Sequence, residues 1–536
     1  MLRLTWGMIL LVLISCQNEE QDSGGRGNTF YLNLLSEPTT LNPITSTDAY
    51  TTEVISHTHE SLLDKDPDSY EWVPSLASEW EISKDKKVFT FKLRKGVTWH
   101  DGKPMTAEDV KFSFDVIFDP EYNAAHKRPY FEGLDRVEIV DEHTVKFYTK
   151  TKYYQNFDVA AGITVLPKHV YSTDKKNKRL NKIVMGTGPY KLETYDKGKK
   201  IILVKNENWW GRKVDFYKDQ HQFDKIGFRF VGDQTVSLEM FKKGNLDFRG
   251  LDNEEYMKKT DGEGWGTKYI KVKTENKSPK SYNFYGWNLK KPLFQDVRVR
   301  KALAHLINRP LMLDKFEFNM SEYATGPQYI QSDYASQKVK PIMYDPKKAL
   351  KLLTEAGWKD TDGDLILDKI VDGKKVDLRF SVIDPYEGFM KYNTIFKEDC
   401  KKVGIDLEIK IVEWNTFTKL LDEKNFDAVR LAWGGTINWE PKQIWHSDSA
   451  VAGGSNFISY SNKKVDKLID EARVTFDRKD RVKILKQIYE IIADDAAYAY
   501  FFNKKVTTYA HQSRIYKPKD TFNYTIGTSY WKLVAE

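Results

Sequence analysis

Two short patterns in the chain hold residue types that carry chemistry in other proteins. His59 and Glu60 stand together as they do in the helix of a zinc protease, but Leu63 stands where the second histidine is needed. Residues 186–188, which read GTG, begin like a dinucleotide-binding loop, but Lys191 replaces the third glycine. We therefore expect a turn at 186–188, and we expect His59 to be a partly exposed polar residue on a helix.

A third pattern, residues 360–364, reads DTDGD and alternates carboxylates as a calcium-binding loop does. Gly363 falls at the fourth loop position rather than the sixth, and Val371 stands where a bidentate glutamate is needed. We predict a turn between a helix and a strand here, without a metal. The chain also lacks a GxSxG nucleophile elbow and a GxxxxGK[ST] phosphate loop, so we expect no catalytic residues and no cofactor.

The two cysteines of the chain, Cys16 and Cys400, are too few for a multi-cysteine metal site. Cys400 lies in a segment with helical spacing, and we expect its thiol to be a small buried apolar group. Cys16 follows the apolar run 4–14, which comes after Arg3. This run has the length of a signal-peptide core and is too short to span a bilayer.

Residues 13–16, which read LISC, resemble the bacterial lipobox, in which a lipid is attached to the cysteine sulfur and the leader is cut before it. We predict a signal peptide at 1–15 and lipidation of Cys16. Residues 16–28 are polar and rich in glycine, which predicts a flexible tether. The body would then be extracytoplasmic, as a periplasmic or cell-surface lipoprotein on a membrane; an ordinary secretory signal is the alternative.

The charge of the chain argues against nucleic acid as a partner. The 84 basic and 77 acidic residues give a net charge of +7 and are interleaved along the chain. Nucleic-acid binding requires a concentrated footprint of Lys and Arg, which is missing. The length of 536 residues exceeds what one hydrophobic core supports and predicts several structural units.

Strand and helix patterns alternate through the chain and predict a mixed α/β architecture. We expect strands at 29–35, 88–93, 145–148 and 201–204. We expect helices at 110–118, 297–307, 465–473 and 482–492. A capping box of Thr106 and Asp109 would begin the first of these helices. A further helix would begin at Pro346 and end at Gly357.

The runs PSLASEW, FTFKLRKGVTWHDGKP and TAEDV within residues 74–110 resemble the signature of the family 5 extracellular solute-binding proteins. This family includes the oligopeptide, dipeptide and nickel-binding components of ABC importers. Further similarities follow in the family's order and cover essentially the whole exported chain. They are EPTTLNP at 37–43, GTGPY at 186–190, DVRVRKAL at 296–303, AGW at 356–358, and the segments 404–414, 426–433 and 456–466.

The resemblance implies an α/β fold of the periplasmic binding protein-like class II, with two lobes, a hinge and an extra inserted domain. Carried onto this sequence, lobe I is expected at 29–55, 183–280 and 506–536. The inserted domain is expected at 56–182, and lobe II at 281–505.

The resemblance also implies a function without enzymatic activity. The chain would be a monomer that captures a peptide by closure of two lobes and meets the permease subunits of an ABC importer. In the peptide-binding relatives, an aspartate after the tryptophan that matches Trp433 pairs with the α-amino group of the ligand, but Thr436 occupies that place here. Glu440 could supply the missing charge, or the ligand could lack a free amine. We expect the cleft to be lined by Glu37, Trp433, Gly435, Thr436, Trp439 and Glu440.

Three alternatives stay open. The solute could be a nickel chelate or a sugar, because the family has members of both kinds. The chain could instead be a surface lipoprotein with a chaperone-like or adhesive role, or a hydrolase, which would turn over peptides when purified. Trp433 and Trp439 could also form a tryptophan-rich corner of the core rather than a stacking surface for a solute.

Overall fold

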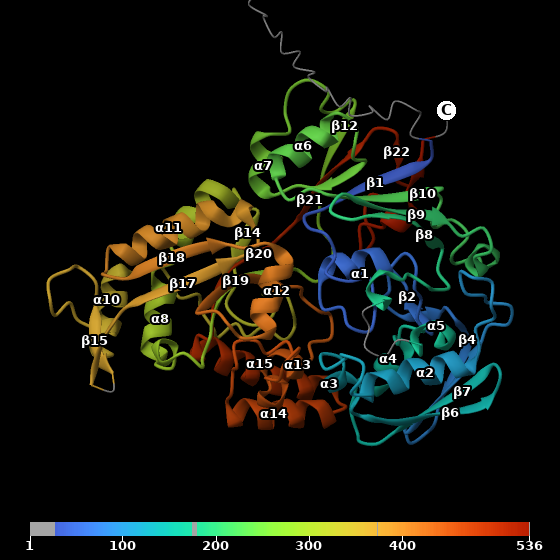
Figure 1. The fold of residues 1–536 in the computed structure, drawn as a ribbon, viewed down its shortest axis with the longest axis horizontal. Helices are drawn as coiled ribbons and strands as arrows, with labels where there is room; N and C mark the ends of the chain where they lie inside the picture. Colours follow the sequence, from blue (N-terminus) through green and yellow to red (C-terminus); the bar gives the residue numbers. More distant parts are fainter. Residues whose placement is uncertain (1–26, 174–178, 372, 535–536) are drawn as a thin grey trace, which may run out of the picture.

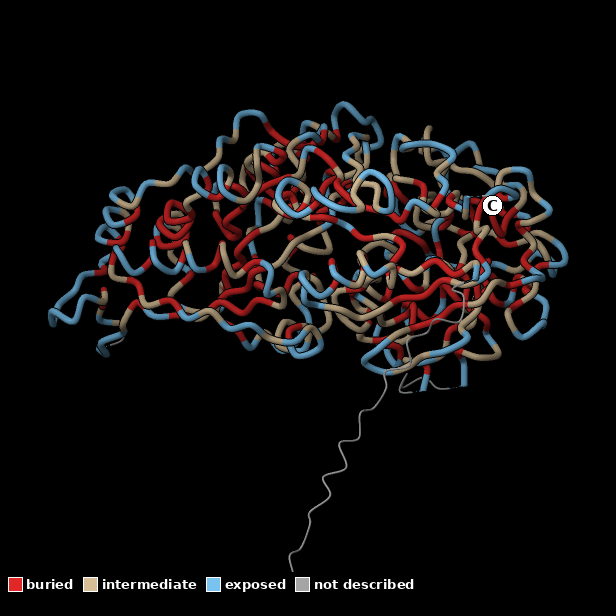
Figure 2. Tube along the Cα trace, turned by 90° about the horizontal axis from the view of Figure 1, so that it is seen from above, coloured by how far each residue is buried: buried red, intermediate tan, exposed pale blue. Residues whose placement is uncertain are grey.

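The computed structural model describes residues 27–173, 179–371 and 373–534 (Figure 1). Three larger sheets lie in separate parts of the molecule. We use lobe I for the part built on the seven-stranded sheet, lobe II for the part built on the six-stranded sheet, and inserted domain for the part built on the four-stranded sheet. Figure 2 shows buried stretches inside these parts and exposed stretches along the outer loops.

Lobe I is built on a mixed sheet. Its strands, in spatial order, are β12 (Tyr269–Thr274), β21 (Thr507–Gln512), β11 (Phe248–Gly250), β1 (Thr29–Leu34), β10 (Lys225–Phe230), β9 (Lys200–Lys205) and β8 (Tyr190–Asp196). Its helices are α1 (Ala49–Ile55), α6 (Gln234–Lys242) and α7 (Asn253–Lys258). Phe30, Leu32 and Leu34 of β1 are buried because alternate side chains of a strand point to one face. The predicted strands 29–35 and 201–204 are thus confirmed.

Lobe II is built on the second mixed sheet, whose core continues into the helices around it. Its strands, in spatial order, are β14 (Ser321–Tyr323), β20 (Tyr498–Lys504), β13 (Tyr282–Trp287), β19 (Ala428–Trp433), β17 (Arg379–Asp384) and β18 (Asp406–Ile411). Its helices are α8 (Val297–His305), α9 (Arg309–Met312), α10 (Pro346–Glu355), α11 (Met390–Lys401), α12 (Trp414–Asp422), α13 (Lys442–Trp445), α14 (Lys463–Val474) and α15 (Arg478–Asp495). Gly357 ends α10 at a φ of +92°, and Cys400 is fully buried on α11, as predicted.

The inserted domain packs α2 (Ala107–Phe118) on an antiparallel sheet, with α3 (Arg128–Phe131), α4 (Asn156–Ala161) and α5 (Lys168–Tyr171) around it. The sheet has the order β4 (Ala77–Ile82), β5 (Val88–Leu93), β7 (Thr144–Thr149) and β6 (Leu134–Asp141). Phe89, Phe91 and Leu93 of β5 are buried, whereas Lys92, between Phe91 and Leu93, is exposed. The predicted alternation with a period of two is therefore confirmed. The Asp109 carboxylate accepts the Thr106 N–H at 2.9 Å in the predicted capping box.

Three two-stranded sheets complete the strands of the described residues. They are β2 (Leu63–Lys65) with β3 (Trp72–Pro74), β15 (Asp368–Val371) with β16 (Lys374–Asp377), and β22 (Ile515–Tyr516) with β23 (Lys532–Leu533). The pair β2 and β3 belongs to the inserted domain, and β15 and β16 form a hairpin that projects from lobe II (Figure 1).

The chain passes between the two lobes by two short connections. Residues 275–281 lead from β12 in lobe I to β13 in lobe II, and residues 505–506 lead from β20 back to β21. Strands that are consecutive in sequence thus lie in different sheets. Two adjacent backbone crossings of this kind provide a hinge between rigid bodies.

The inserted domain is fastened to lobe I by the residues around 186–190. A Cβ on Gly186 would lie 1.8 Å from the carbonyl oxygen of Thr58, so only glycine fits there, and the Gly188 N–H donates to the same oxygen at 2.9 Å. The Glu60 carboxylate accepts from the indole N–H groups of Trp209 and Trp210, both at 2.8 Å. The glycines of the GTG run therefore let its backbone pack closely against Thr58, in keeping with the predicted turn.

The sequence prediction for His59 was wrong. Helix α1 ends at Ile55, and His59 is buried behind it, with its Nδ1 2.9 Å from the Thr58 hydroxyl oxygen. Burial lowers the pKa of His59 to about 3. The residues next to His59 in the sequence do not indicate that Tyr171 of the inserted domain packs against it.

Candidate functional site

The candidate site begins where β19 ends, at the edge of the lobe II sheet. β19 runs between β13, with which it is antiparallel, and β17, with which it is parallel. Trp433 is its last residue and is half-buried. The Trp433 indole N–H donates to the Tyr498 hydroxyl at 3.2 Å, and its ring stacks on Phe457 at a centroid distance of 5.8 Å. The indole is thus fixed on one side by the core of lobe II while part of it stays open to solvent.

We name residues 433–440 the binding loop. Its Gly435 packs against the hinge connection, where a Cβ would lie 2.5 Å from the Lys280 carbonyl oxygen and 2.6 Å from the Tyr329 ring. Thr436 is exposed, and its carbonyl oxygen accepts from the buried Gln328 amide at 3.0 Å. Gly435 thus lies against the hinge, and Gln328 also donates to the Thr436 hydroxyl at 3.3 Å, while the residue stays exposed to solvent.

The last two residues of the binding loop are buried. Trp439 is 5% exposed and packs edge-on against Tyr489 at a centroid distance of 6.4 Å. The Glu440 carboxylate lies 3.0 Å from the Arg473 guanidinium, and its side chain is only 3% exposed. Burial raises the pKa of Glu440. The carboxylate that the sequence offers as a replacement for the aspartate thus already has a cationic partner within the protein.

Glu37 lies in lobe I, in the segment between β1 and α1. Its carboxylate accepts from the Tyr195 hydroxyl at 2.6 Å, and burial together with this carboxylate raises the pKa of Tyr195. Among the described residues, no hydrogen bond joins Glu37 to the binding loop. The structure therefore groups Trp433, Gly435 and Thr436 closely and leaves Glu37 apart on the other lobe.

Sequence reasoning missed Lys280, which lies against the binding loop, and a contact between the two lobes. Lys280 is buried beside Gly435, and its ammonium donates to the Asn276 amide oxygen at 3.1 Å. Tyr50 of lobe I meets Trp414 of lobe II with ring centroids 5.4 Å apart. Burial raises the pKa of Tyr50 to about 12. Nothing in the local sequence marks these residues, because their neighbours in space are far away in sequence.

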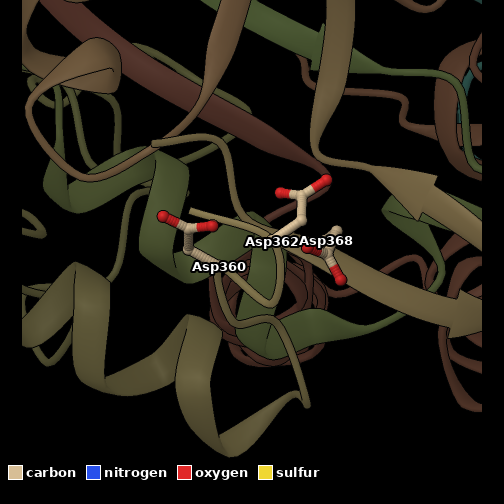
Figure 3. Close-up of side chains that lie close together, drawn as sticks. All are labelled: Asp360, Asp362 and Asp368. Carbon is tan, nitrogen blue, oxygen red and sulfur yellow. The ribbon is translucent and has the colours of Figure 1, made fainter. Parts of the chain in front are cut away.

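The acidic loop after α10 brings together Asp360, Asp362 and Asp368, with one oxygen of each within 4.8 Å of the others (Figure 3). Asp360 accepts the N–H of Gly363 at 2.7 Å, and Asp368 accepts the Thr361 hydroxyl at 2.7 Å. The Lys375 ammonium contacts Asp362. Internal donors thus already serve these carboxylates, in keeping with the predicted turn.

Two further sequence predictions concern membranes. Within the described residues, no helix is long and apolar enough to cross a bilayer. Cys16 and the predicted signal peptide lie outside the described residues.

Comparison with known proteins gives the site its context. Residues 71–455 match the profile of the bacterial extracellular solute-binding proteins, family 5 Middle. The chain is 30% identical to the oligopeptide-binding protein AppA of Bacillus subtilis over 501 residues, which cover 91% of this chain and 89% of that protein. It is 29% identical to the dipeptide-binding protein of Escherichia coli over 453 residues, which cover 80% of each chain.

Solved structures agree with the sequence matches. The structure of AppA from Bacillus subtilis in complex with a nonapeptide has a TM-score of 0.85 at 26% identity and covers 95% of this chain and 99% of that chain. NikZ from Campylobacter jejuni in complex with Ni(L-His) has a TM-score of 0.80 at 25% identity, with 94% and 99% covered.

The predicted fold class is confirmed, since these proteins share the whole two-lobed architecture with its inserted domain. The profile match spans well over half of the chain, and the family consists of extracellular solute-binding proteins rather than enzymes. The chain therefore belongs to the bacterial extracellular solute-binding proteins, family 5.

Proposed function

We propose that the chain captures peptides between its two lobes and delivers them to the permease subunits of an ABC importer. The observation that carries this proposal is the likeness, over nearly the full length of both chains, to an oligopeptide-binding protein whose structure holds a nonapeptide. An extended peptide suits a site at a strand end because its backbone can form hydrogen bonds whatever its sequence. The site would use Trp433, Gly435 and Thr436 from lobe II and Glu37 from lobe I.

The neutral Thr436 sets the expected chemistry of the peptide. Thr436 carries no charge for a free α-amino group, and Glu440 is paired with Arg473. We therefore propose that the peptide is held mainly by its backbone and by apolar contact with Trp433. N-acetylated and free peptides of the same sequence would then bind with similar affinity.

Mass spectrometry of ligands released from gently purified protein tests the proposal directly. A ladder of mixed short peptides is the expected result. A single non-peptide species would overturn it. Loss of peptide over time in a mixture with purified protein would instead indicate a hydrolase.

A nickel chelate is the second candidate, because NikZ with Ni(L-His) is similar over nearly the whole chain. Metal analysis of the same purified sample separates the two candidates. Nickel in a one-to-one ratio with histidine would favour the chelate, and peptides without nickel would favour the first proposal.

We propose further that the mature protein is a monomeric lipoprotein, anchored to a membrane through Cys16 and the tether 16–28. A lipid chain contributes about 0.8 kcal/mol per buried methylene, so more than one chain gives a firm anchor. Membrane fractionation of Cys16→Ser tests the anchor. The wild type should sediment with membranes and the variant should not, whereas equal distribution would exclude lipidation at Cys16.

A further inference from the structure

A polar contact joins the inserted domain to lobe II at the second half of the binding loop. The Tyr154 hydroxyl donates to the Trp439 carbonyl oxygen at 3.2 Å, and the Tyr154 backbone N–H donates to the Arg473 carbonyl oxygen at 2.9 Å. The Tyr130 hydroxyl donates to the Gln443 amide oxygen. Residues about 300 positions apart in sequence thus meet directly next to the segment proposed to hold the solute.

Arg473 is the centre of this contact. Its guanidinium lies 3.0 Å from Glu440 on its own lobe and 3.1 Å from Glu132 on the inserted domain. It also donates to the Pro129 carbonyl oxygen at 2.8 Å and lies 3.9 Å above the Tyr153 ring. One buried cation therefore binds the end of the binding loop and three groups of the inserted domain at once.

The two partners of Arg473 differ in exposure, and this difference separates their roles. The side chains of Arg473 and Glu440 are 7% and 3% exposed, whereas Glu132 is 42% exposed. Lys442 contacts Glu132 at 2.6 Å as a second cation. The Arg473–Glu440 ion pair is thus buried within lobe II, whereas the Arg473–Glu132 ion pair lies at the rim of the contact, where water reaches Glu132.

The contact lies at the end of the binding loop that is away from the hinge, whereas Gly435 packs against hinge residue Lys280. In Figure 1 the connections 275–281 and 505–506 cross between the lobes near β12, β20 and β21, and α3 meets α13 below α1 and α12. The inserted domain is fastened to lobe I through Glu60 and Gly186. Rotation about the hinge would therefore separate α3 from α13 further than any contact near the crossings.

We propose that Glu132, Tyr154 and Arg473 form a clasp that positions the end of the binding loop and sets how often the lobes close before a solute arrives. Its role in positioning rests on the proposed function, because it assumes that residues 433–440 hold the solute. Its role in closure does not, because the contact joins protein groups alone. A solute that binds the closed form gains apparent affinity in proportion to the closed fraction.

Electron paramagnetic resonance distances test the clasp without any solute. Spin labels at Val140→Cys and Lys347→Cys, both exposed, report the separation of inserted domain and lobe II in a full chain that also carries Cys16→Ser. Cys400 is fully buried and stays unlabelled. In Glu132→Gln with Tyr154→Phe, the ratio of closed to open molecules should fall about tenfold, since the two rim ion pairs of Glu132, with Arg473 and Lys442, and one hydrogen bond are lost.

A matched control removes an ion pair of the same inserted domain that does not reach lobe II. Glu79 contacts Lys92 at 2.6 Å, and Glu79→Gln should leave the distance distribution unchanged. Arg473→Lys should retain part of the closed population, because a lysine keeps the charge but loses the fork of donors. Equal distributions in the wild type and the Glu132 and Tyr154 double variant would overturn the clasp.

Kinetics with a defined probe, an equimolar library of free pentapeptides, separate the clasp from the proposed function. The double variant should release bound peptide about tenfold faster while its unfolding midpoint in urea stays that of the Glu79→Gln control. If the library does not bind the wild type, the peptide proposal fails, and the solute-free distances still decide whether the clasp exists.

Discussion

The two halves of the binding loop differ in what holds them. Trp433, Gly435 and Thr436 are half-buried or exposed, with Gly435 against the hinge, whereas Trp439 and Glu440 are buried against lobe II and the inserted domain. Eight consecutive residues thus contain an accessible part and a part committed to the core. The difference teaches that two tryptophans six positions apart can have different surroundings, one partly open to solvent and one packed in the core.

The largest effect is expected at Trp439. Trp439→Ala empties a well-packed site beside Tyr489 and should lower the free energy of unfolding by about 3–5 kcal/mol. Urea unfolding followed by circular dichroism measures it. A loss below about 1 kcal/mol would show that the second half of the loop is not a core element.

Glu440→Ala should lower the free energy of unfolding by about 3 kcal/mol, because it leaves the buried Arg473 guanidinium without the Glu440 carboxylate. Glu440→Gln keeps the shape and one acceptor and should cost less. Thermal unfolding of both variants measures the difference. If Glu440 instead anchors a solute, peptide affinity would fall while the melting temperature stays unchanged.

Gly435→Ala tests the packing of the first half against the hinge. Its Cβ would lie 2.5 Å from the Lys280 carbonyl oxygen, so the backbone must shift at a cost of about 1–3 kcal/mol. Gly434→Ala is the matched control, since its Cβ would meet nothing within 4 Å. Unfolding and peptide titration should show a clear loss for the first variant only, and equal behaviour would refute the contact with the hinge.

Trp433→Ala should separate affinity from stability. The indole is half-buried, so peptide affinity should fall about tenfold, equivalent to about 1.4 kcal/mol, with a smaller stability loss than Trp439→Ala. Isothermal titration with the pentapeptide library measures the affinity. Unchanged affinity in a folded variant would remove Trp433 from the site.

The smallest expected effect is a loss of stability at low pH. Burial lowers the pKa of both His59 and His126 to about 3. A histidine in the unfolded chain keeps its ordinary pKa near 6.5, so below that pH the unfolded chain binds more protons than the folded chain. Stability should therefore fall as the pH drops from 7 toward 3, by about 1 kcal/mol per histidine at pH 5.5.

His126→Gln should reduce this pH dependence in thermal unfolding. The Glu440 carboxyl acts in the opposite direction: because its pKa is raised in the folded state, the folded chain binds more protons there than the unfolded chain, and stability rises as the pH falls. An unchanged slope in the variant, measured between pH 7 and pH 5.5, would contradict the assignment to His126.

Much of the fold could be predicted from the sequence because local patterns decide it. The alternation in 88–93, the cap at Thr106 and the glycine stop at Gly357 each depend on neighbours within a few residues. The run of family motifs gave the family, whereas the position of Trp433 at the end of β19 came from the structure. The lobe limits 29–55, 56–182 and 281–505 stay predictions.

What only the tertiary structure decided is which polar side chains are already paired. From the sequence, Glu440 could supply a charge to the ligand, yet in the structure it forms an ion pair with Arg473 of α14. The sequence predicts His59 to be partly exposed on a helix, yet it is buried, with the Tyr171 hydroxyl of the inserted domain 3.5 Å from its Nε2. The sequence by itself determined many of the strands and helices, because their patterns are local, and its family motifs implied a two-lobed solute-binding protein. Burial and ion pairing join residues distant in the chain, and these only the folded packing reveals.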